Sequence, residues 1–389
     1  MLVKITDVET YALIWPTFEK PFWMSIAPIG NVSELVVKVH TDDGIVGIGE
    51  GHGGQLVGIV GDYTKRVTGA AAIVNEGLKQ LLIGEDPLRN DHLWEKMFRE
   101  TYKVGWSVPG WPRPQIMTAI GTVDAALWDI KGKAAGMPVW KLLGGSRDRV
   151  PCYVTGGYYQ EGKTVADLVK ECEGYLKMGY TGIKIKVGGV SVEEDVARVK
   201  AVRESIGPDV KLMLDVNEGW DVLTAIRAAQ AMEEYNPYWL EEPVHWYDNV
   251  DGLAQVAAAT RIPCASGEQL YTRYQARDLI ARGGIRIMQF DCTKAAGPTE
   301  WLKIAGMAAM HHVQMAPHHD PQIHGHLVAA VPNGLILETF PDPARDPIWG
   351  ELFAVRPEIK NSEIVFPEDR PGWGLELDEK VMAKRAVKA

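Results

Sequence analysis

From about residue 150 onward, short apolar runs alternate with segments of helical periodicity. Eight of these runs have the length of a strand, and they cover residues 151–155, 182–187, 210–216, 239–241, 262–265, 285–290, 314–317 and 335–338. The segment 191–206 is typical of the intervening helices, because it begins with a capping box formed by Ser191 and Glu194 and ends before Gly207. Eight strands with helices between them predict an α/β fold, a parallel (β/α) barrel.

The first part of the chain has a different pattern. Apolar and polar residues alternate at 34–39 and 45–50 on either side of the turn 41–44, which predicts a β-hairpin. Helical periodicity follows at 64–102, and a helix at 117–135 ends at a Gly-Met-Pro stop. We therefore predict an α+β domain at 1–125, the barrel at 126–341 and a tail at 342–389 that packs back on the first domain.

Composition and charge narrow the class of protein. The 389 residues are 46% hydrophobic and 24% charged, which is typical of a globular chain. A net charge of −10 argues against nucleic acid or an anionic membrane as partner. The four cysteines form no C-x-x-C pair, no apolar run reaches membrane-spanning length, and the charged N-terminus lacks a signal-peptide pattern. We expect a cytoplasmic protein.

Two lysines occupy one apolar run. Lys184 and Lys186 are two residues apart, so in a strand their side chains project from the same face. On a buried strand, their mutual repulsion and lost hydration would lower the pKa of at least one lysine and make it a usable base. An edge strand with two solvated lysines is the alternative, and the pair alone does not decide between them.

Polar side chains recur where the predicted strands end. Because the C-terminal ends of parallel barrel strands meet at one mouth, we expect these residues to converge there: Lys184, Lys186, Asp215, Glu241, Glu268, Asp291, His318 and Glu338. Asp215, Glu241 and Glu268 would repel one another unless a cation were present. Ligation by oxygen alone favours Mg²⁺, with Mn²⁺ as an alternative. A network of salt bridges with neighbouring lysines is the other interpretation.

A histidine follows the seventh predicted strand directly. His318 comes after the strand 314–317, and Asp291 ends the strand before it. A carboxylate bonded to one ring nitrogen fixes the imidazole tautomer and raises its basicity, so His318 and Asp291 are predicted to form an acid/base dyad. The alternative is a histidine whose ring is satisfied within a loop.

These residues carry a family resemblance. The order K-x-K, Leu214-Asp-Val-Asn217, Glu241-Glu-Pro243, Gly267-Glu268, Asp291, His318 and Glu338, with the helix 124–135, resembles the mandelate racemase branch of the enolase superfamily. The resemblance spans nearly the whole chain. It implies an α+β cap over a modified TIM barrel, (β/α)7β. The muconate lactonising and dipeptide epimerase branches have a lysine where Asp291 stands, so those activities are disfavoured.

The resemblance also implies roles for the strand-end residues. Asp215, Glu241 and Glu268 would bind Mg²⁺, and Lys186 would be one base, with Lys184 lowering its pKa and contacting the substrate carboxylate. The dyad of His318 and Asp291 would act from the opposite face. Glu338 would donate a hydrogen bond to the intermediate, which requires a protonated carboxyl.

The implied reaction begins with abstraction of a proton α to a carboxylate. Elimination of a β-hydroxyl from the resulting enediolate would make the protein a hydro-lyase that converts a sugar acid to a 2-keto-3-deoxy acid. The alternatives are a racemase or epimerase of a 2-hydroxy acid or amino-acid derivative, and a non-catalytic barrel that binds without reacting.

Specificity would depend on loops of the cap. The aromatic loop 15–24 and the loop 51–54 are the candidates, and predicted substrate contacts are Lys184, Asn217, His319, Trp23 and His52. The expected partner is a small carboxylate rather than nucleic acid or a membrane. The resemblance also implies a homo-oligomer.

Overall fold

The first domain is an antiparallel sheet covered by helices. The computed structural model describes residues 3–15, 20–56, 64–103, 111–145, 147–343 and 345–387. Strands β1 (Ile5–Trp15), β3 (Pro28–Thr41) and β4 (Val46–Leu56) pair in the order β1-β3-β4, and β2 (Phe22–Trp23) pairs with β3. The helices around this sheet are α1 (Thr64–Ile73), η1 (Val74–Leu78), α2 (Lys79–Leu82), α3 (Asn90–Phe98), α4 (Glu100–Lys103), α5 (Arg113–Ala135) and α6 (Val139–Leu142).

The predicted hairpin is confirmed, and its second strand is longer than predicted. Val36 pairs with Glu50 in an antiparallel register, and Gly44 supplies the positive φ of the turn, 86°. The segment 51–54, predicted as a loop, continues β4, because its backbone pairs with β3 up to Leu56. Within the predicted loop 15–24, residues 16–19 lie outside the described residues.

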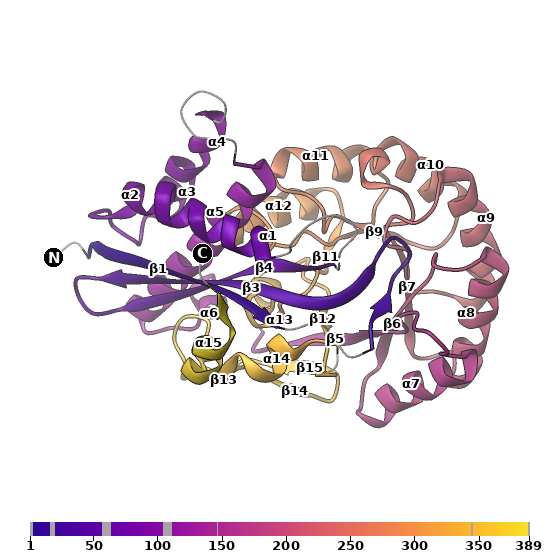
Figure 1. Cartoon of the computed structure of the whole chain (residues 1–389). Helices are drawn as coiled ribbons and strands as arrows, with labels where there is room; N and C mark the ends of the chain where they lie inside the picture. The colour runs from indigo at the N-terminus through magenta and orange to yellow at the C-terminus, as the bar shows by residue number, and fades with distance from the viewer. Residues whose placement is uncertain are drawn as a thin grey trace.

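Glycines allow helix α5 to pack directly on β4. A Cβ atom added at Gly49 would lie 1.9 Å from the backbone oxygen of Thr122, and one added at Gly47 would lie 2.2 Å from that of Ala126. Only the missing side chains allow the strand and the small-residue helix to approach so closely. This contact fixes the sheet to the helix that leads into the barrel (Figure 1).

We predict that Gly49→Ala destabilises the protein by about 2–3 kcal/mol, because the helix must move away from the strand. The control is Gly306→Ala in helix α12 (Gly297–Met310), where an added Cβ would meet nothing within 4 Å. This second change should be neutral or slightly stabilising, since alanine favours helix. Denaturant unfolding measures both, and equal midpoints for the two variants would contradict the packing.

The second domain is the predicted barrel, which is confirmed. Its parallel strands are β5 (Arg149–Gly156), β6 (Gly182–Lys186), β7 (Lys211–Asp215), β8 (Trp239–Glu241), β9 (Cys264–Ser266), β10 (Ile287–Met288), β11 (Gln314–Met315) and β12 (Leu337–Thr339). They pair in sequence order, β12 pairs with β5, and a bridge from Met315 to Gly334 closes the barrel.

One α-helix separates each strand from the next, as (β/α)7β requires. These helices are α7 (Val165–Lys177), α8 (Val192–Ile206), α9 (Val222–Met232), α10 (Asp251–Ala259), α11 (Arg273–Arg282), α12 and α13 (Pro321–Ala330), with short 3₁₀ turns at η2 (Glu233–Tyr235) and η3 (Trp246–Asp248). The predicted capping box at Ser191 is present, because its side chain accepts from the backbone of Glu194 and the Glu194 side chain accepts in return. No helix of the described residues is both long and apolar enough to cross a membrane.

An apolar layer fills the barrel below its polar mouth. Inward-facing side chains from around the barrel make up this layer: Tyr153, Met213, Trp239, Ala265, Ile287, Ala316 and Ile336. Strand periodicity places the next inward-facing side chains two residues further on, so Asp215 and Glu241 stand directly above Met213 and Trp239.

The tail contacts both domains. Strand β17 (Ala386–Val387) pairs with β1 of the first sheet, whereas the hairpin of β14 (Glu358–Lys360) and β15 (Glu363–Val365) pairs with β5 of the barrel. The remaining elements of the tail are α14 (Pro347–Glu351), β13 (Phe353–Val355), β16 (Glu376–Leu377) and α15 (Glu379–Arg385). The domain limits at 125 and 341 stay predictions.

Candidate active site

Lys184 and Lys186 lie inside the barrel. Strand β6 has neighbours on both sides, β5 and β7, and Lys184 is fully buried while Lys186 is 5% exposed. The interpretation of an edge strand with solvated lysines is therefore excluded.

Carboxylates surround both ammonium groups. The Nζ atom of Lys184 lies 2.6 Å from Oε1 of Glu241 and 2.9 Å from Oε1 of Glu338, and that of Lys186 lies 2.5 Å from Oδ2 of Asp215. Burial lowers the pKa of each lysine, but the carboxylates outweigh it and the pKa of both is raised. The prediction that the pKa of at least one lysine falls is therefore wrong. Lys184 does lower the pKa of Lys186, but Asp215 raises it more strongly.

The protonation state of Glu338 also differs from the prediction. Burial raises its pKa, yet the charge of Lys184 and the other cations, together with the Thr155 hydroxyl that donates to Oε1 at 2.5 Å, hold the pKa below its usual range. The backbone N–H of His319 donates to its other oxygen at 3.1 Å. Glu338 is therefore ionised in this arrangement, not protonated as predicted.

Of the three predicted metal ligands, Asp215 and Glu241 end strands β7 and β8, whereas Glu268 follows the end of β9 by two residues; all three are buried. Burial and the charge of Asp215 raise the pKa of Glu241 to about 7, although Lys184 acts in the opposite direction. Three neighbouring acceptor atoms are buried and have no hydrogen-bond partner among the described residues: Oδ1 of Asn217, Oε1 of Glu218 and Oε2 of Glu242. This part of the site has more buried oxygen acceptors than hydrogen-bond donors, which suits the binding of a divalent cation such as Mg²⁺.

The alternative network of salt bridges is also visible here, since Asp215 and Glu241 are paired with the lysines. Within the described ranges, the one group of three His, Cys, Asp or Glu residues whose ligand atoms lie within 4.8 Å of one another is His52, His319 and Asp320. In that group, Nδ1 of His319 already lies 2.9 Å from Oδ1 of Asp320, so this nitrogen and oxygen bond to each other.

His318 and Asp291 form the predicted dyad. Nδ1 of His318 lies 2.8 Å from Oδ2 of Asp291, while the other carboxylate oxygen accepts from the backbone N–H groups of Thr293 and Lys294 at 2.9 and 3.0 Å. Despite burial, the bond to His318 and the charges of the nearby imidazoles hold the pKa of Asp291 well below its usual range. The aspartate is therefore a fixed anion that orients the ring.

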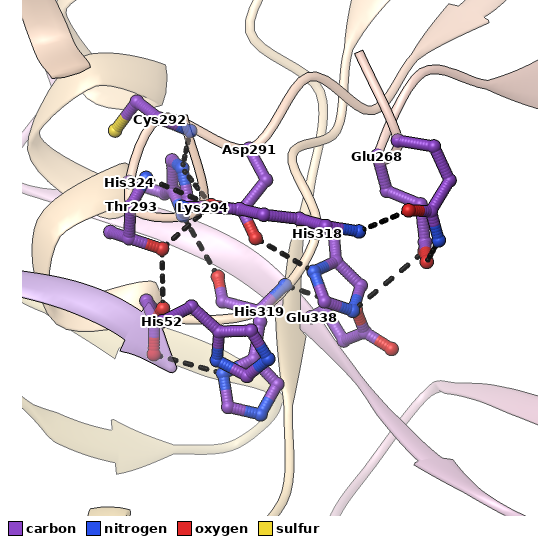
Figure 2. A network of polar contacts seen from close by, with 12 residues as sticks. His52, Glu268, Asp291, Cys292, Thr293, Lys294, His318, His319, His324 and Glu338 are labelled. Atoms are coloured by element: carbon purple, nitrogen blue, oxygen red, sulfur yellow. Dashed lines mark hydrogen bonds and ion pairs between the residues drawn. The ribbon is translucent and has the colours of Figure 1, made fainter. Parts of the chain in front are cut away.

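The other ring nitrogen of His318 faces Glu268 across the mouth of the barrel. Its Nε2 lies 3.7 Å from Oε2 of Glu268, and Figure 2 shows the ring between this carboxylate and Asp291. Burial lowers the pKa of His318, but Glu268 and the bond to Asp291 outweigh it and raise the pKa to about 9. The alternative of a histidine satisfied only within a loop does not fit this geometry.

Several of the predicted site residues line the same pocket. Lys186, His318, Glu268, Glu338, Asn217 and His52 all line a cavity of about 110 Å³ between the cap and the barrel. Lys186 comes from β6 and His318 follows β11; β5 and β12 lie between these strands on one side of the barrel and β7 to β10 on the other. The two side chains therefore approach the pocket from different sides.

Three of the predicted substrate contacts are not supported. Trp23 does not line the pocket: strand alternation buries Phe22 against Tyr158, and the Trp23 ring stacks on Tyr159 at 6.4 Å between centroids. His319 lies behind the pocket wall, with Nε2 3.4 Å from Oδ2 of Asp346. Lys184 is likewise beneath the lining rather than in it.

Sequence reasoning missed other residues of the lining. The polar ones are Arg66, Tyr158, Glu218, Glu242, Gln269, Lys294 and Arg345. Glu218 directly follows Asn217, and Glu242 directly follows Glu241. Both glutamates therefore lie in or next to motifs from which other site residues were predicted. Tyr158 and Arg345 come from loops after β5 and β12, where no periodicity marks which side chain faces inward.

The fold is a barrel with an α+β cap, and its site is a pocket of ionisable side chains at the C-terminal ends of the strands. Residues 6–144 match the family model "Mandelate racemase / muconate lactonizing enzyme, N-terminal domain", and residues 167–381 match "Enolase C-terminal domain-like". The chain belongs to the mandelate racemase/muconate lactonizing enzyme family of the enolase superfamily.

Similar proteins agree with this assignment. The chain is 35% identical to arabinonate dehydratase of Saccharolobus solfataricus, over 99% of this chain and 100% of the relative. It is 34% identical to L-talarate/galactarate dehydratase of Salmonella typhimurium, over 90% and 82%. A solved structure of an L-talarate/galactarate dehydratase mutant liganded with Mg and L-glucarate has a TM-score of 0.87 at 32% identity, covering 99% of this chain and 92% of that one. The predicted family and class of enzyme, a hydro-lyase, are confirmed.

Proposed function

We propose that this protein is a Mg²⁺-dependent dehydratase that converts a sugar acid or related hydroxy acid to a 2-keto-3-deoxy acid. The observation that carries the proposal is the single pocket lined by both Lys186 and His318, with the dyad partner Asp291 behind the histidine. A base and an acid on different sides of one small pocket suit removal of a proton and a hydroxyl from adjacent carbons.

Asp215, Glu241 and Glu268 would hold the cation. When bound, Mg²⁺ supplies positive charge that stabilises the substrate carboxylate as it gains electron density. Of these three residues, Asp215 and Glu241 now bond to Lys186 and Lys184. A bound Mg²⁺ would therefore compete with the lysines for these carboxylates. Once the ion pairs are weakened, the repulsion between the two ammonium groups would lower the pKa of Lys186.

Lys186 removes the α-proton in this scheme. Its ammonium rests over the face of Tyr158, 5.1 Å from the ring centroid, which positions the long side chain in the pocket. The α C–H bond breaks, its electrons pass into the carboxylate, and Lys184 balances part of the resulting negative charge; a cation held by Asp215, Glu241 and Glu268 would supply the rest.

His318 completes the reaction as the general acid. It donates its Nε2 proton to the β-hydroxyl, the Cβ–O bond breaks, and water leaves with that proton. The resulting enol becomes the 2-keto product. Asp291 holds the ring in the orientation this transfer needs, since it bonds to the opposite nitrogen.

Racemisation or epimerisation is the alternative at the same site. There His318 would return a proton to the α-carbon instead of protonating a hydroxyl. We favour dehydration because two of the similar proteins above are sugar-acid dehydratases. Cytoplasmic location, a homo-oligomeric assembly and the use of Mn²⁺ stay predictions.

A substrate panel tests the proposal. The protein would be incubated with aldonic and aldaric acids and Mg²⁺, and 2-keto products would be assayed. Formation of a keto acid from one of them is expected. Exchange of the α-proton in D₂O without any keto acid would refute dehydration, and a protein inert toward every acid would favour the non-catalytic barrel.

We predict that Glu241→Gln weakens Mg²⁺ binding by more than about 100-fold, because the variant loses one of three anionic ligands. Glu363→Gln, on strand β15 away from the barrel mouth, is the control and should leave the affinity unchanged. Calorimetric titration with MgCl₂ measures both. Equal affinities would show that the cation binds elsewhere.

A further inference from the structure

Ser25 joins the cap to the mouth of the barrel. It lies at the tip of the hairpin formed by β2 and β3, residues 24–27, and side chains of this tip line the catalytic pocket. The hydroxyl of Ser25 donates a hydrogen bond that the carbonyl oxygens of Val216 and Asn217 share, and the second oxygen lies 3.0 Å from Oγ. Both acceptors directly follow Asp215, one of the proposed metal ligands.

The peptide group between Val216 and Asn217 is fixed at both ends. Its carbonyl oxygen accepts from Ser25 and, at the longer distance of 3.3 Å, from the N–H of Gly219. Its N–H donates to Oδ1 of Asp215 at 3.0 Å. Rotation of this peptide group would turn the N–H away from the carboxylate, and it becomes easier once the oxygen loses the Ser25 hydroxyl. Ser25 therefore acts, through one peptide group, on the orientation of Asp215.

The next peptide group belongs to a strained turn. Asn217 and Glu218 both have a positive φ, 45° and 67°, which residues other than glycine adopt only when their surroundings hold them there. The carbonyl oxygen of Asn217 accepts from Ser25, and the N–H of Glu218 donates to the carbonyl oxygen of Glu242 at 2.8 Å. One contact from the cap and one from the end of the next strand thus keep the turn in this conformation.

The tip also packs directly on the barrel at Ser25. A Cβ atom added at Gly219, which follows β7, would lie 2.6 Å from Cβ of Ser25. One added at Gly188, which follows β6, would lie 3.3 Å from the same atom. The tip reaches this position because neither segment has a side chain there.

We propose that Ser25 is a positioning residue for the cation site, and that closure of the tip and binding of Mg²⁺ are coupled through it. The inference rests on the proposed function, because it takes Asp215 as a metal ligand. With the tip in place, the turn holds the carboxylate in one orientation, so a cation does not have to order it on binding. Coupling is reciprocal, so a bound cation should hold the tip closed by the same factor.

A second pair of hydrogen bonds keeps the hairpin on the barrel when Ser25 is replaced. The backbone N–H of Trp23 donates to the carbonyl oxygen of Tyr159 at 2.9 Å, and the N–H of Tyr159 donates in return at 3.0 Å. Removal of the hydroxyl should therefore release the tip alone. If Ser25 served only to fix the cap, the affinity for Mg²⁺ would stay unchanged.

Calorimetric titration with MgCl₂, without substrate, compares the wild type with two variants that disturb the contact in different ways. Ser25→Ala removes the hydroxyl. Gly219→Ala keeps it but places a Cβ atom where Ser25 packs, at a position whose φ is outside the left-handed region. The control is Ser205→Ala at the C-terminal end of helix α8, where the hydroxyl donates to Oε1 of Glu173 at 3.0 Å.

We expect Ser25→Ala and Gly219→Ala each to weaken Mg²⁺ binding about 5- to 10-fold, because the cation must then order the turn itself. Ser205→Ala should bind Mg²⁺ as the wild type does. Hydrogen exchange, followed by mass spectrometry, gives a second readout. Mg²⁺ should slow exchange at 216–219 in all four proteins, but at the tip only in the wild type and in Ser205→Ala.

Several results would overturn the inference. Unchanged Mg²⁺ affinity in Ser25→Ala would do so and leave the metal site in place. Slower exchange at the tip when Mg²⁺ is added to Ser25→Ala would do so too, since the coupling would then follow another route. Loss of protection across the whole cap sheet in this variant would indicate a merely structural role. A wild type that binds no Mg²⁺ would overturn both the inference and the proposed metal site.

Discussion

Replacing Lys186 with methionine is expected to lower keto-acid formation by at least about 10³-fold, because Lys186 is the base proposed to remove the α-proton. Methionine keeps an unbranched side chain against Tyr158, so the barrel should remain folded. Exchange of the substrate α-proton with D₂O should be lost to the same extent.

The control for this variant is Lys200→Met, at an exposed position of helix α8. It should retain the rates of the wild type. If Lys186→Met still exchanged the α-proton at the wild-type rate, Lys186 would not be the base, and the assignment of acid and base in this pocket would have to be reversed.

His318→Asn should separate the two halves of the reaction. Without the acid, expulsion of the β-hydroxyl is expected to slow by at least about 10³-fold. Proton abstraction by Lys186 should continue, so the substrate should gain deuterium while little keto acid forms. NMR in D₂O measures both rates in one sample.

Exposed His311 provides the matched control, and His311→Asn should behave as the wild type. Parallel loss of exchange and elimination in His318→Asn would contradict the separation of roles. It would indicate that the dyad of His318 and Asp291 takes part in removing the α-proton.

The strand-end residues could be predicted because barrel geometry converts sequence spacing into position. Each βα unit returns the chain to the same mouth, so Asp215, Glu241 and Asp291 had to converge once the strands were recognised. The dyad of His318 and Asp291 followed from the same rule applied to two neighbouring strands.

The protonation states could not be predicted in this way. The pKa of Lys184 depends on Glu241 and Glu338, which are distant in sequence and lie 2.6 and 2.9 Å away in the fold. Sequence spacing placed the two lysines on one face and indicated their repulsion, but it did not give the distances to the carboxylates that outweigh it.

The sequence also did not show which loop residues line the pocket. Trp23 and His319 looked suitable for substrate contact by residue type, yet one stacks on Tyr159 and the other bonds to Asp320. Arg345, which does line the pocket, lies in an irregular segment whose side-chain directions have no period to read.

The proposed reaction removes a proton with Lys186 and a hydroxyl with His318 in one pocket. Its most direct test is a time course in D₂O of wild type, Lys186→Met and His318→Asn with a sugar acid that the wild type accepts. We predict keto acid from the wild type, neither exchange nor keto acid from Lys186→Met, and exchange alone from His318→Asn. Keto acid at the wild-type rate from either variant would refute the role proposed for the replaced residue.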